Sequence, residues 1–325
     1  METYGCQMNK AESESILIEL ADAGWVPGGS EEEADLVILN TCSVRETAEE
    51  RIRGRLGHFR HVKSRRPFTL VLMGCMAERL KEKILDEYPE VDVVVGTFSK
   101  RELLAAVHSA EAKKAPIVST GREEYSFAGV HSTGGIKAFV PIMHGCNNWC
   151  SYCIVPSVRG PEVSRPPEEI LAEMRLLDRR GTREVTLLGQ NVNSYTWQGS
   201  GIALSFADLL GMIKNEAGSI RWLRFLTSHP KDFSESLLAV MSESPLFCRH
   251  VHLPLQSGST KILGFMNRGY TAEEYLSLVG RIRAALTGVS ITTDILIGFP
   301  GESELDFEET VDLIKEIGFD DAFTY

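Results

Sequence analysis

The sequence lacks any long hydrophobic run, since no stretch approaches the roughly 18 consecutive apolar residues that a membrane-spanning helix needs. Residues 1–6 contain no basic stretch followed by an apolar one, which is the pattern of a secretory signal peptide. Basic residues are in deficit, with 34 Lys and Arg against 45 Asp and Glu and a net charge of −11. We therefore expect a cytoplasmic protein with no membrane span, and one that does not hold nucleic acid with its whole surface.

Internal repeats, low-complexity tracts and a glycine-rich dinucleotide fingerprint are also missing. The 325 residues suffice for two domains, and 43% hydrophobic with 24% charged residues is an ordinary globular composition. We predict an N-terminal domain over residues 1–110, a linker over 111–135, where apolar periodicity is lost, and a second domain over 136–325.

Alternating helix and strand signals predict the fold of the N-terminal domain. Apolar runs at 36–39, 70–73 and 91–95 predict buried parallel strands of an open α/β sheet. Asn9, with Glu12 three residues on, predicts a helix start, and Ile16, Leu17 and Leu20 then form its apolar stripe.

The second domain repeats the alternation with a longer period. Its strand signals lie at 138–143, 184–188, 222–226, 250–253, 290–295 and near Ala322. Helix starts are marked by Pro166–Pro167 and by capping boxes at Thr271/Glu274 and Ser303/Asp306. The last of these helices has Phe307, Val311 and Ile314 on one face. This order predicts a partial (β/α)6 barrel. Because the chain stops inside a strand signal, we expect residues beyond Tyr325 and a few before Met1.

Three cysteines, Cys146, Cys150 and Cys153, give the strongest chemical signal. Thiolates at this spacing can ligate three irons of one 4Fe–4S cluster and leave the fourth iron open. Their place after the first barrel strand puts that iron at the carboxyl-terminal mouth, where such barrels do chemistry. The alternative is a structural zinc site with His144 as the fourth ligand.

Three further cysteines each follow a strand signal. Cys6 follows Gly5, Cys75 follows Gly74, and Cys42 follows the run at 36–39. Because the carboxyl ends of parallel strands share one edge of a sheet, these thiols are expected to converge into a second three-cysteine cluster. Taken singly, each is equally well a buried small hydrophobic residue, and we assign Cys248 to the core on that ground.

Polar residues follow the later barrel strands. Amides and a carboxylate at the strand ends are candidates to bind the ribose, amino and carboxylate groups of a small cofactor, although turns favour the same residue types. The candidates are Gln190, Asn193, Gln256 and Asp294, with Ser228 and His229 at the end of the third strand.

Arginines accumulate between Arg45 and Arg66, and they form a candidate RNA-binding patch despite the acidic balance. Its members are Arg51, Arg53, Arg55, Arg60 and Arg65. The alternative is an ordinary solvated helix face.

Residues 146–153 resemble the signature of the radical S-adenosylmethionine (SAM) superfamily. The three-cysteine N-terminal domain resembles that of the methylthiotransferases, and the segments 3–9, 40–46, 187–193 and 252–259 are similar to the tRNA-modifying, MiaB-type branch. The resemblance covers essentially the whole chain. Ser157 departs from it, because an aromatic residue usually stands there, and this puts local packing near the cofactor in doubt.

The resemblance implies a transferase with two 4Fe–4S clusters. Cys146, Cys150 and Cys153 would hold the SAM-binding cluster, and Cys6, Cys42 and Cys75 an auxiliary cluster that carries the sulfur. One SAM would methylate that sulfur and another would yield a 5′-deoxyadenosyl radical, which attacks C2 of N6-isopentenyladenosine-37 in the anticodon loop of tRNA. An electron donor such as flavodoxin or ferredoxin and a C-terminal RNA-binding β-barrel domain after Tyr325 are also implied, whereas no sulfur donor is.

Two other functions stay open at this point. One is methylthiotransfer to threonylcarbamoyladenosine in tRNA or to an aspartate of a ribosomal protein, which the Gln7-Met8-Asn9 stretch disfavours. The other is a non-catalytic iron–sulfur or zinc binding module, against which the polar residues of the barrel mouth speak.

Overall fold

The computed structural model describes residues 1–43, 46–121, 125–199 and 201–325. Val44 and Arg45, part of a predicted motif, and residues 122–124 of the predicted linker lie outside this range. Contacts divide the chain into an N-terminal unit, Met1–Thr133 with Ile154–Val163, and a barrel unit, Gly134–Cys153 with Ser164–Tyr325. None of the helices in the described part of the chain is long and apolar enough to cross a membrane.

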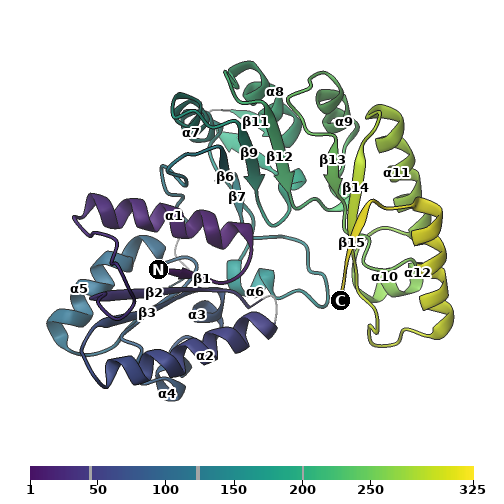
Figure 1. The fold of residues 1–325 in the computed structure, drawn as a ribbon. Helices are drawn as coiled ribbons and strands as arrows, with labels where there is room; N and C mark the ends of the chain where they lie inside the picture. The colour runs from purple at the N-terminus through teal and green to yellow at the C-terminus, as the bar shows by residue number, and fades with distance from the viewer. Residues whose placement is uncertain (44–45, 122–124, 200) are drawn as a thin grey trace. The chain divides into compact units, whose positions relative to one another are not determined.

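The N-terminal unit is built on a five-stranded parallel sheet in the order β1-β2-β3-β4-β5 (Figure 1). The strands are β1 (Glu2–Thr3), β2 (Leu36–Thr41), β3 (Thr69–Gly74), β4 (Val93–Val95) and β5 (Ile117–Ser119). The helices are α1 (Gln7–Asp22), α2 (Glu46–Lys63), α3 (Cys75–Leu80), α4 (Lys83–Glu87), the 3-10 helix η1 (Lys100–Glu102), α5 (Leu103–Lys113) and α6 (Val155–Arg159).

Two hydrophobic clusters pack the sheet from opposite sides. Ile38 and Val71 pack with residues of α1 and α5, whereas Leu39 and Leu72 pack with α2, α3 and α4. Since both faces are covered, every residue of β3 is buried, which explains the continuous apolar runs in the sequence.

Three features of the N-terminal unit differ from the sequence prediction. Ile117–Ser119 lies in the stretch predicted as linker but pairs with β4, because backbone pairing needs no periodic pattern in so short a strand. Helix α1 begins at Gln7 rather than Asn9, since the Asn9 side chain is buried in tertiary hydrogen bonds instead of capping the helix. Leu17 of the predicted apolar stripe is 43% exposed.

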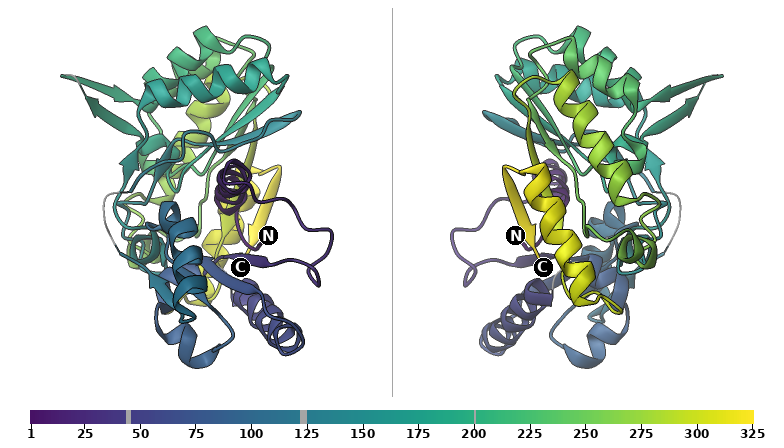
Figure 2. Two further views of the ribbon diagram at one scale, coloured as in Figure 1. Left: turned by 90° about the vertical axis from the view of Figure 1, so that its left-hand side faces the viewer. Right: turned by 90° about the vertical axis from the view of Figure 1, so that its right-hand side faces the viewer.

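The barrel unit contains two three-stranded parallel sheets, β6-β9-β12 and β13-β14-β15, joined by a bridge between Leu223 and Phe247. Their strands are β6 (Lys137–Pro141), β9 (Glu184–Leu188), β12 (Trp222–Leu226), β13 (His250–His252), β14 (Ser290–Ile295) and β15 (Asp321–Thr324). The short strand β7 (Met143–His144) belongs to neither of these two sheets. Strand β8 (Val163–Ser164) lies where the chain passes between the units. The hairpin β10 (Thr196–Gly199) and β11 (Ile202–Ser205) extends away from the sheets (Figure 2).

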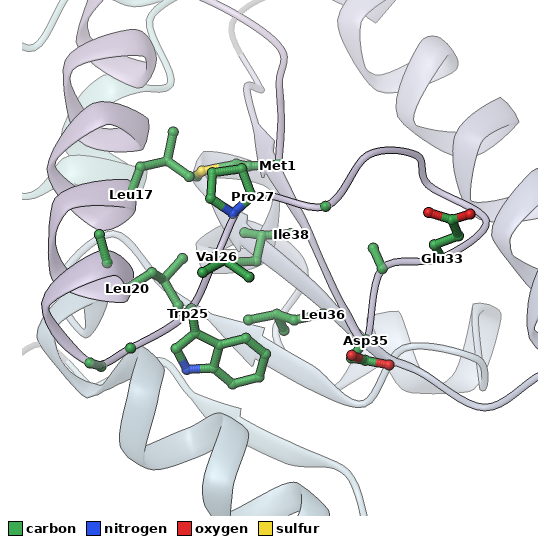
Figure 3. A pocket seen from close by; sticks show the side chains of 15 residues that line it. Met1, Leu17, Leu20, Trp25, Val26, Pro27, Glu33, Asp35, Leu36 and Ile38 are labelled. Carbon is green, nitrogen blue, oxygen red and sulfur yellow. The ribbon is translucent and has the colours of Figure 1, made fainter.

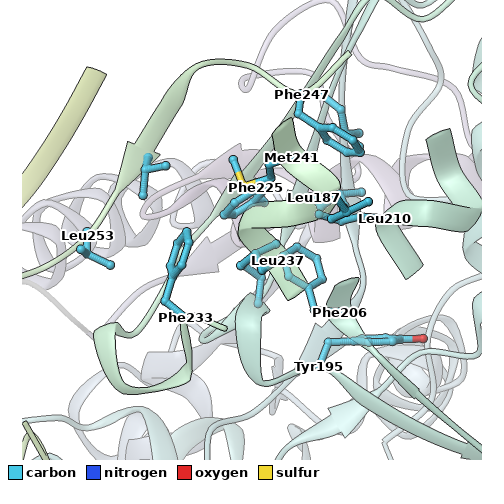
Figure 4. Packing of buried hydrophobic residues seen from close by; sticks show 14 of the residues in the cluster. Leu187, Tyr195, Phe206, Leu210, Phe225, Phe233, Leu237, Met241, Phe247 and Leu253 are labelled. Carbon is cyan, nitrogen blue, oxygen red and sulfur yellow. The ribbon is translucent and has the colours of Figure 1, made fainter. Parts of the chain in front are cut away.

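Helices follow the barrel strands and confirm the predicted partial (β/α)6 architecture. They are α7 (Pro167–Arg179), η2 (Val192–Ser194), α8 (Phe206–Glu216), η3 (Pro230–Asp232), α9 (Glu235–Ser242), α10 (Thr260–Phe265), α11 (Ala272–Ala285) and α12 (Glu304–Ile317). Their apolar faces and the strands form one large core, in which Phe206 and Phe225 stack edge to face with ring centroids 5.2 Å apart (Figure 4).

Both predicted capping boxes are present, at Thr271 and Ser303. The predicted apolar face of α12 is wrong by one position, because Phe307, Val311 and Ile314 are only partly buried. The helix instead buries Asp306 and Thr310 together with Leu313 and Ile317. The two polar residues bond to the serines of the 257–259 loop, and these bonds rotate the helix away from its most apolar orientation.

Candidate functional site

The structure brings Cys6, Cys42 and Cys75 to the same edge of the N-terminal sheet. Cys42 and Cys75 directly follow β2 and β3, and Cys6 follows β1 after two residues. Since the three strands are parallel neighbours, all three thiols lie at their carboxyl ends. Cys6 is exposed, whereas Cys42 and Cys75 are buried.

Glycine is required before two of these cysteines. Gly5 has φ +131°, and a Cβ placed on it would lie 2.6 Å from Cβ of Cys42. Gly74 has φ +96°, and a Cβ there would lie 2.5 Å from the backbone oxygen of Thr41. Any larger residue would push the β1–α1 turn away from Cys42 or strand β3 away from β2. The two glycines thus allow the turns that bring the thiols to one edge.

Arg159, the last residue of α6, is buried at this edge of the N-terminal unit. Its Nη1 donates to Glu12 at 2.7 Å and its Nη2 to Oδ1 of Asn9 at 3.4 Å. Burial raises the pKa of the Cys75 thiol, and the Arg159 guanidinium partly offsets that rise. A cation beside the thiol favours its ionised form, which is the form that binds metal.

The barrel cysteines lie in the loop that follows β7. Cys146 and Cys150 are buried and Cys153 is partly exposed. The backbone N–H of Asn148 donates to Sγ of Cys146 at 3.4 Å, and the N–H of Cys153 donates to the Cys150 oxygen at 3.0 Å. The loop therefore curls back on itself, with its first sulfur accepting a backbone hydrogen bond.

The turn between α10 and α11 supports this loop. The Ser151 N–H donates to Met266 O at 3.1 Å and its hydroxyl to Phe265 O at 2.9 Å. The Asn267 amide donates to the backbone oxygen of Trp149 at 2.8 Å. These bonds hold the loop on the barrel although it has no secondary structure of its own.

The four predicted cofactor residues lie at or near the carboxyl ends of the barrel strands, and they differ in the contacts that they make. Both ends of the Asn193 amide bond the backbone of His229, each at 2.9 Å, so this side chain ties two loops together. The Asp294 carboxylate lies 3.4 Å from Nε2 of His252. Gln256 has φ +73°. Its backbone N–H donates to Asp294 O at 2.8 Å, and its backbone oxygen accepts from the N–H of Leu296 at 2.9 Å.

Buried polar atoms without a hydrogen-bond partner gather at the ends of β9 and β12. Within the described part of the chain they include Oε1 of Gln190, Oδ1 of Asn191, Oγ of Ser228 and Nε2 of His229. Buried polar atoms are nearly always paired in a complete site, so this group fits a polar ligand such as SAM.

His229 is a neutral donor in this group. Its Nδ1 accepts a hydrogen bond from the Lys231 N–H at 3.4 Å, which leaves the proton on Nε2. Burial, followed by the charges of Arg268 and Lys231, lowers its pKa to about 2. The ring therefore offers an N–H to the barrel mouth at every physiological pH.

A single-ion metal site is not formed by the described residues, since no group of three His, Cys, Asp or Glu side chains among them could hold one ion. This arrangement gives no support to the zinc alternative. A cubane differs from a single ion because each thiolate binds a separate iron, so its ligands need not converge on one point.

Comparison with known proteins identifies the family. A model described as "Radical SAM superfamily" matches residues 140–314, and one described as "Uncharacterized protein family UPF0004" matches residues 1–96. The chain is 46% identical, over its full length and 75% of the relative's, to the tRNA-2-methylthio-N(6)-dimethylallyladenosine synthase of Treponema pallidum (strain Nichols). The synthase of the same name from Treponema denticola is 48% identical over the same shares, and that of Syntrophus aciditrophicus 44% over the full chain and 71% of the relative.

The chain belongs to the radical SAM methylthiotransferase family. Enzymes of this family use SAM and 4Fe–4S clusters.

Two solved structures share the fold of this methylthiotransferase. The radical SAM methyltransferase TsrM from Kitasatospora setae aligns with a TM-score of 0.66 and 14% identity, covering 95% of this chain and 64% of that one. The cobalamin-dependent radical SAM enzyme OxsB aligns with a TM-score of 0.58 and 13% identity over 92% of this chain and 45% of that one. At such identities the likeness concerns the fold alone.

The predicted arginine patch of the methylthiotransferase is largely matched by acidic residues. Arg55 bonds Glu2 and Glu31, Arg60 lies 3.0 Å from Glu90, and Arg53 lies 3.4 Å from Glu87. Only Arg51 and Arg65 of the five lack an ion pair among the described residues. A role of this patch in RNA binding stays a prediction. Its positive charge that no acidic residue matches is smaller than the sequence alone suggests.

A pocket of the N-terminal unit is lined by none of its cysteines. It has a volume of about 560 Å³ and lies against the amino end of β2, with Leu17, Trp25 and Ile38 in its wall (Figure 3). It contains no cysteine, histidine, lysine or arginine, so it offers no group for the family's chemistry.

Sequence reasoning missed Arg268 and misplaced Cys248. Arg268 is 6% exposed and donates to Sγ of Cys150 at 3.4 Å. A buried arginine in the Met-Asn-Arg-Gly-Tyr turn looks like a surface residue in the sequence, and only its short distance in space from the cysteine loop reveals it. Cys248 is half-buried beside Arg224 and Glu184 rather than in the core.

Proposed function

We propose that this chain inserts a methylthio group at C2 of N6-isopentenyladenosine at position 37 of tRNA. One SAM methylates the sulfur and a second supplies the radical that activates the base. The strongest support is the identity of 44–48% over the whole chain to synthases named for this product. The three cysteines at the sheet edge and the three in the barrel loop agree with it.

The ligand sets are assigned by donor chemistry. Cys146, Cys150 and Cys153 hold the SAM-binding 4Fe–4S cluster, and Cys6, Cys42 and Cys75 hold the auxiliary one. When bound, these clusters supply the electron that cleaves SAM and the sulfur that is transferred. The protein's part is to position the loops: the Asn148 N–H and the α10–α11 turn hold the barrel cysteines, and Arg159 faces the auxiliary set.

SAM binds at the barrel mouth in this proposal. The unpartnered atoms of Gln190, Asn191, Ser228 and His229 supply acceptors and donors for its polar groups. The amide of Gln256 and the carboxylate of Asp294, which lies 3.4 Å from His252, add further polar groups. Asn193 acts by holding the β9 and β12 loops together.

The partners follow from the chemistry. The substrate is the anticodon loop of tRNA, whose single-stranded bases can be splayed out of the stack. A one-electron donor such as flavodoxin or ferredoxin reduces the SAM-binding cluster, and a cytoplasmic location stays a prediction.

Anaerobic reconstitution followed by iron and sulfide counting tests the assignment. Two clusters correspond to about eight irons, and replacing Cys146, Cys150 and Cys153 together by Ala should leave about half. The parent protein should also give 2-methylthio-N6-isopentenyladenosine by mass spectrometry of digested tRNA. Full iron in the triple variant, or none, would refute the division into two sets.

A further inference from the structure

Arg268 is a buried cation fixed by four hydrogen bonds. Its Nε donates to the Tyr270 hydroxyl at 3.0 Å and its Nη2 to the backbone oxygen of Pro254 at 3.1 Å. Its Nη1 donates to Sγ of Cys150 and to the Tyr152 hydroxyl, each at 3.4 Å. Tyr270 is held in turn by the backbone oxygens of Pro254 and Leu255, at 3.1 and 2.8 Å. The guanidinium therefore meets the sulfur in a defined orientation.

Arg268 has no carboxylate partner among the described residues, which distinguishes it from Arg159 and Arg165, the other arginines that the described structure buries. Arg165 of the same unit is fully buried but bonds Glu173, and Arg159 of the N-terminal unit bonds Glu12. A buried guanidinium without an anion is costly, and such charges are normally paired. Among the groups that Arg268 touches, the Cys150 sulfur is the one that becomes an anion when it binds a metal.

We propose that Arg268 is the counter-charge of the barrel iron–sulfur cluster and raises its reduction potential through the hydrogen bond to Cys150. This inference rests on the proposed function, in which Cys150 is a cluster ligand. The step is the uptake of one electron from an external one-electron donor, with no bond formed or broken and no proton moved. Because reduction adds negative charge, a fixed guanidinium at the sulfur stabilises the reduced state more than the oxidised state.

The burial of Arg268 makes the effect strong and insensitive to salt. A charge at 6% exposure is screened far less than a surface charge. Hydrogen bonds to cluster sulfurs are one of the protein's means of setting the reduction potential, so Arg268 acts as a positioning and tuning residue.

A redox titration followed by electron paramagnetic resonance tests the inference. The parent protein for this titration is the full chain with Cys6, Cys42 and Cys75 replaced by Ala, so that only the barrel cluster contributes to the signal. The Arg268→Gln substitution is made in this parent and compared with it. At a fixed potential the ratio of reduced to oxidised cluster should fall about tenfold in Arg268→Gln, which is a midpoint about 59 mV more negative. Arg268→Lys keeps the charge, and its shift should be clearly smaller. Tyr270→Phe removes one of the supporting bonds without changing charge and serves as the matched neutral control.

The outcomes separate this inference from the proposed function. If the parent holds no iron, the ligand assignment fails and the inference fails with it. If the parent and Arg268→Gln hold equal iron with equal midpoints, the inference alone is overturned. Equal shifts in the Lys and Gln variants would overturn it too, since they would indicate a packing effect. If Arg268→Gln does not retain iron, the midpoint potential of Arg268→Lys decides. A midpoint close to that of the parent supports the role of the charge. A shift that corresponds to a tenfold change in the ratio of reduced to oxidised cluster contradicts it.

Discussion

The side-chain amide of Asn9 donates to Oδ1 of Asn40 at 3.1 Å, and the amide of Asn40 donates back to the Asn9 backbone oxygen at 2.9 Å. Asn9 also donates to the Thr41 oxygen at 2.9 Å and accepts from Sγ of Cys6 at 3.2 Å. Both asparagines are fully buried. The pair fixes the first turn of α1 against the end of β2, and Cys6 and Cys42 take their positions from these two elements.

Glu12 gives the N-terminal unit a pH-dependent stability. Burial alone would raise its pKa, but Arg159 and Lys100 outweigh burial and lower it to about 2. A depressed pKa contributes stability that is complete above the ordinary value of 4.5 and is lost as pH falls toward 2. Glu12→Gln should cost about 3–5 kcal/mol at neutral pH, since the buried Arg159 and the mostly buried Lys100 lose their partner.

Urea unfolding of the metal-free protein between pH 7 and pH 3 measures this cost. The difference between parent and Glu12→Gln should narrow below pH 4.5, while the exposed Glu50→Gln should behave like the parent throughout. A difference that stays constant across the range would contradict the role of Glu12.

Cys42→Ala should separate the two halves of the reaction. It removes one ligand of the proposed auxiliary set and leaves Cys146, Cys150 and Cys153 untouched, so reductive SAM cleavage should persist while methylthiolated tRNA disappears. Chromatography of 5′-deoxyadenosine and mass spectrometry of tRNA nucleosides measure the two products. Cys248→Ala is the matched control and should retain both. Methylthiolated tRNA from the Cys42→Ala enzyme would refute the scheme.

His229→Phe should weaken SAM binding about five- to tenfold, because a lost hydrogen bond is worth roughly 1 kcal/mol and the phenyl ring keeps the contact with Tyr270. With the pKa of His229 lowered to about 2, the parent's affinity should show no histidine step between pH 5.5 and 8. Equilibrium binding to reconstituted protein checks both statements, with the exposed His108→Phe as control. An unchanged affinity in His229→Phe would remove this residue from the SAM site.

The arginine patch makes a graded prediction for tRNA binding. Neutralising Arg51, Arg60 and Arg65 together should flatten the salt dependence by up to about two units of log–log slope, at a little under one per phosphate contact. Arg51 and Arg65 should account for most of this change, because Glu90 already matches Arg60. Arg55→Gln should change it little, because Glu2 and Glu31 already match that charge. Filter-binding curves at several salt concentrations measure the slopes. Overlaying curves for the triple variant and the parent would assign the tRNA contact to another surface.

The sequence predicted best those features that depend on burial and local capping. Strands β9, β12 and β14 begin and end at the predicted residues. Their buried apolar residues, which pack in the barrel core, make their extent visible in the sequence. The capping box at Thr271 is a local pattern and was equally visible. The placement of Cys6, Cys42 and Cys75 followed from the position of each just after a predicted parallel strand.

Features that depend on tertiary polar contacts could not be predicted in this way. Which face of α12 is buried depends on Asp306 and Thr310, which a hydrophobic pattern treats as surface residues. Arg268 acquires its role from Cys150, a neighbour distant in sequence, and β5 is too short to show a pattern.

The cysteine spacings also bear on the order of assembly. The barrel thiols lie within residues 146–153, so a nascent chain can present all three to iron as soon as that loop has been synthesised. The thiols at the ends of β1, β2 and β3 are brought together only after two long connections have closed, which costs chain entropy and takes time. Under the proposed ligand assignment, iron can be held at the sheet edge only once β1, β2 and β3 have paired, so iron bound there reports that the N-terminal sheet has formed.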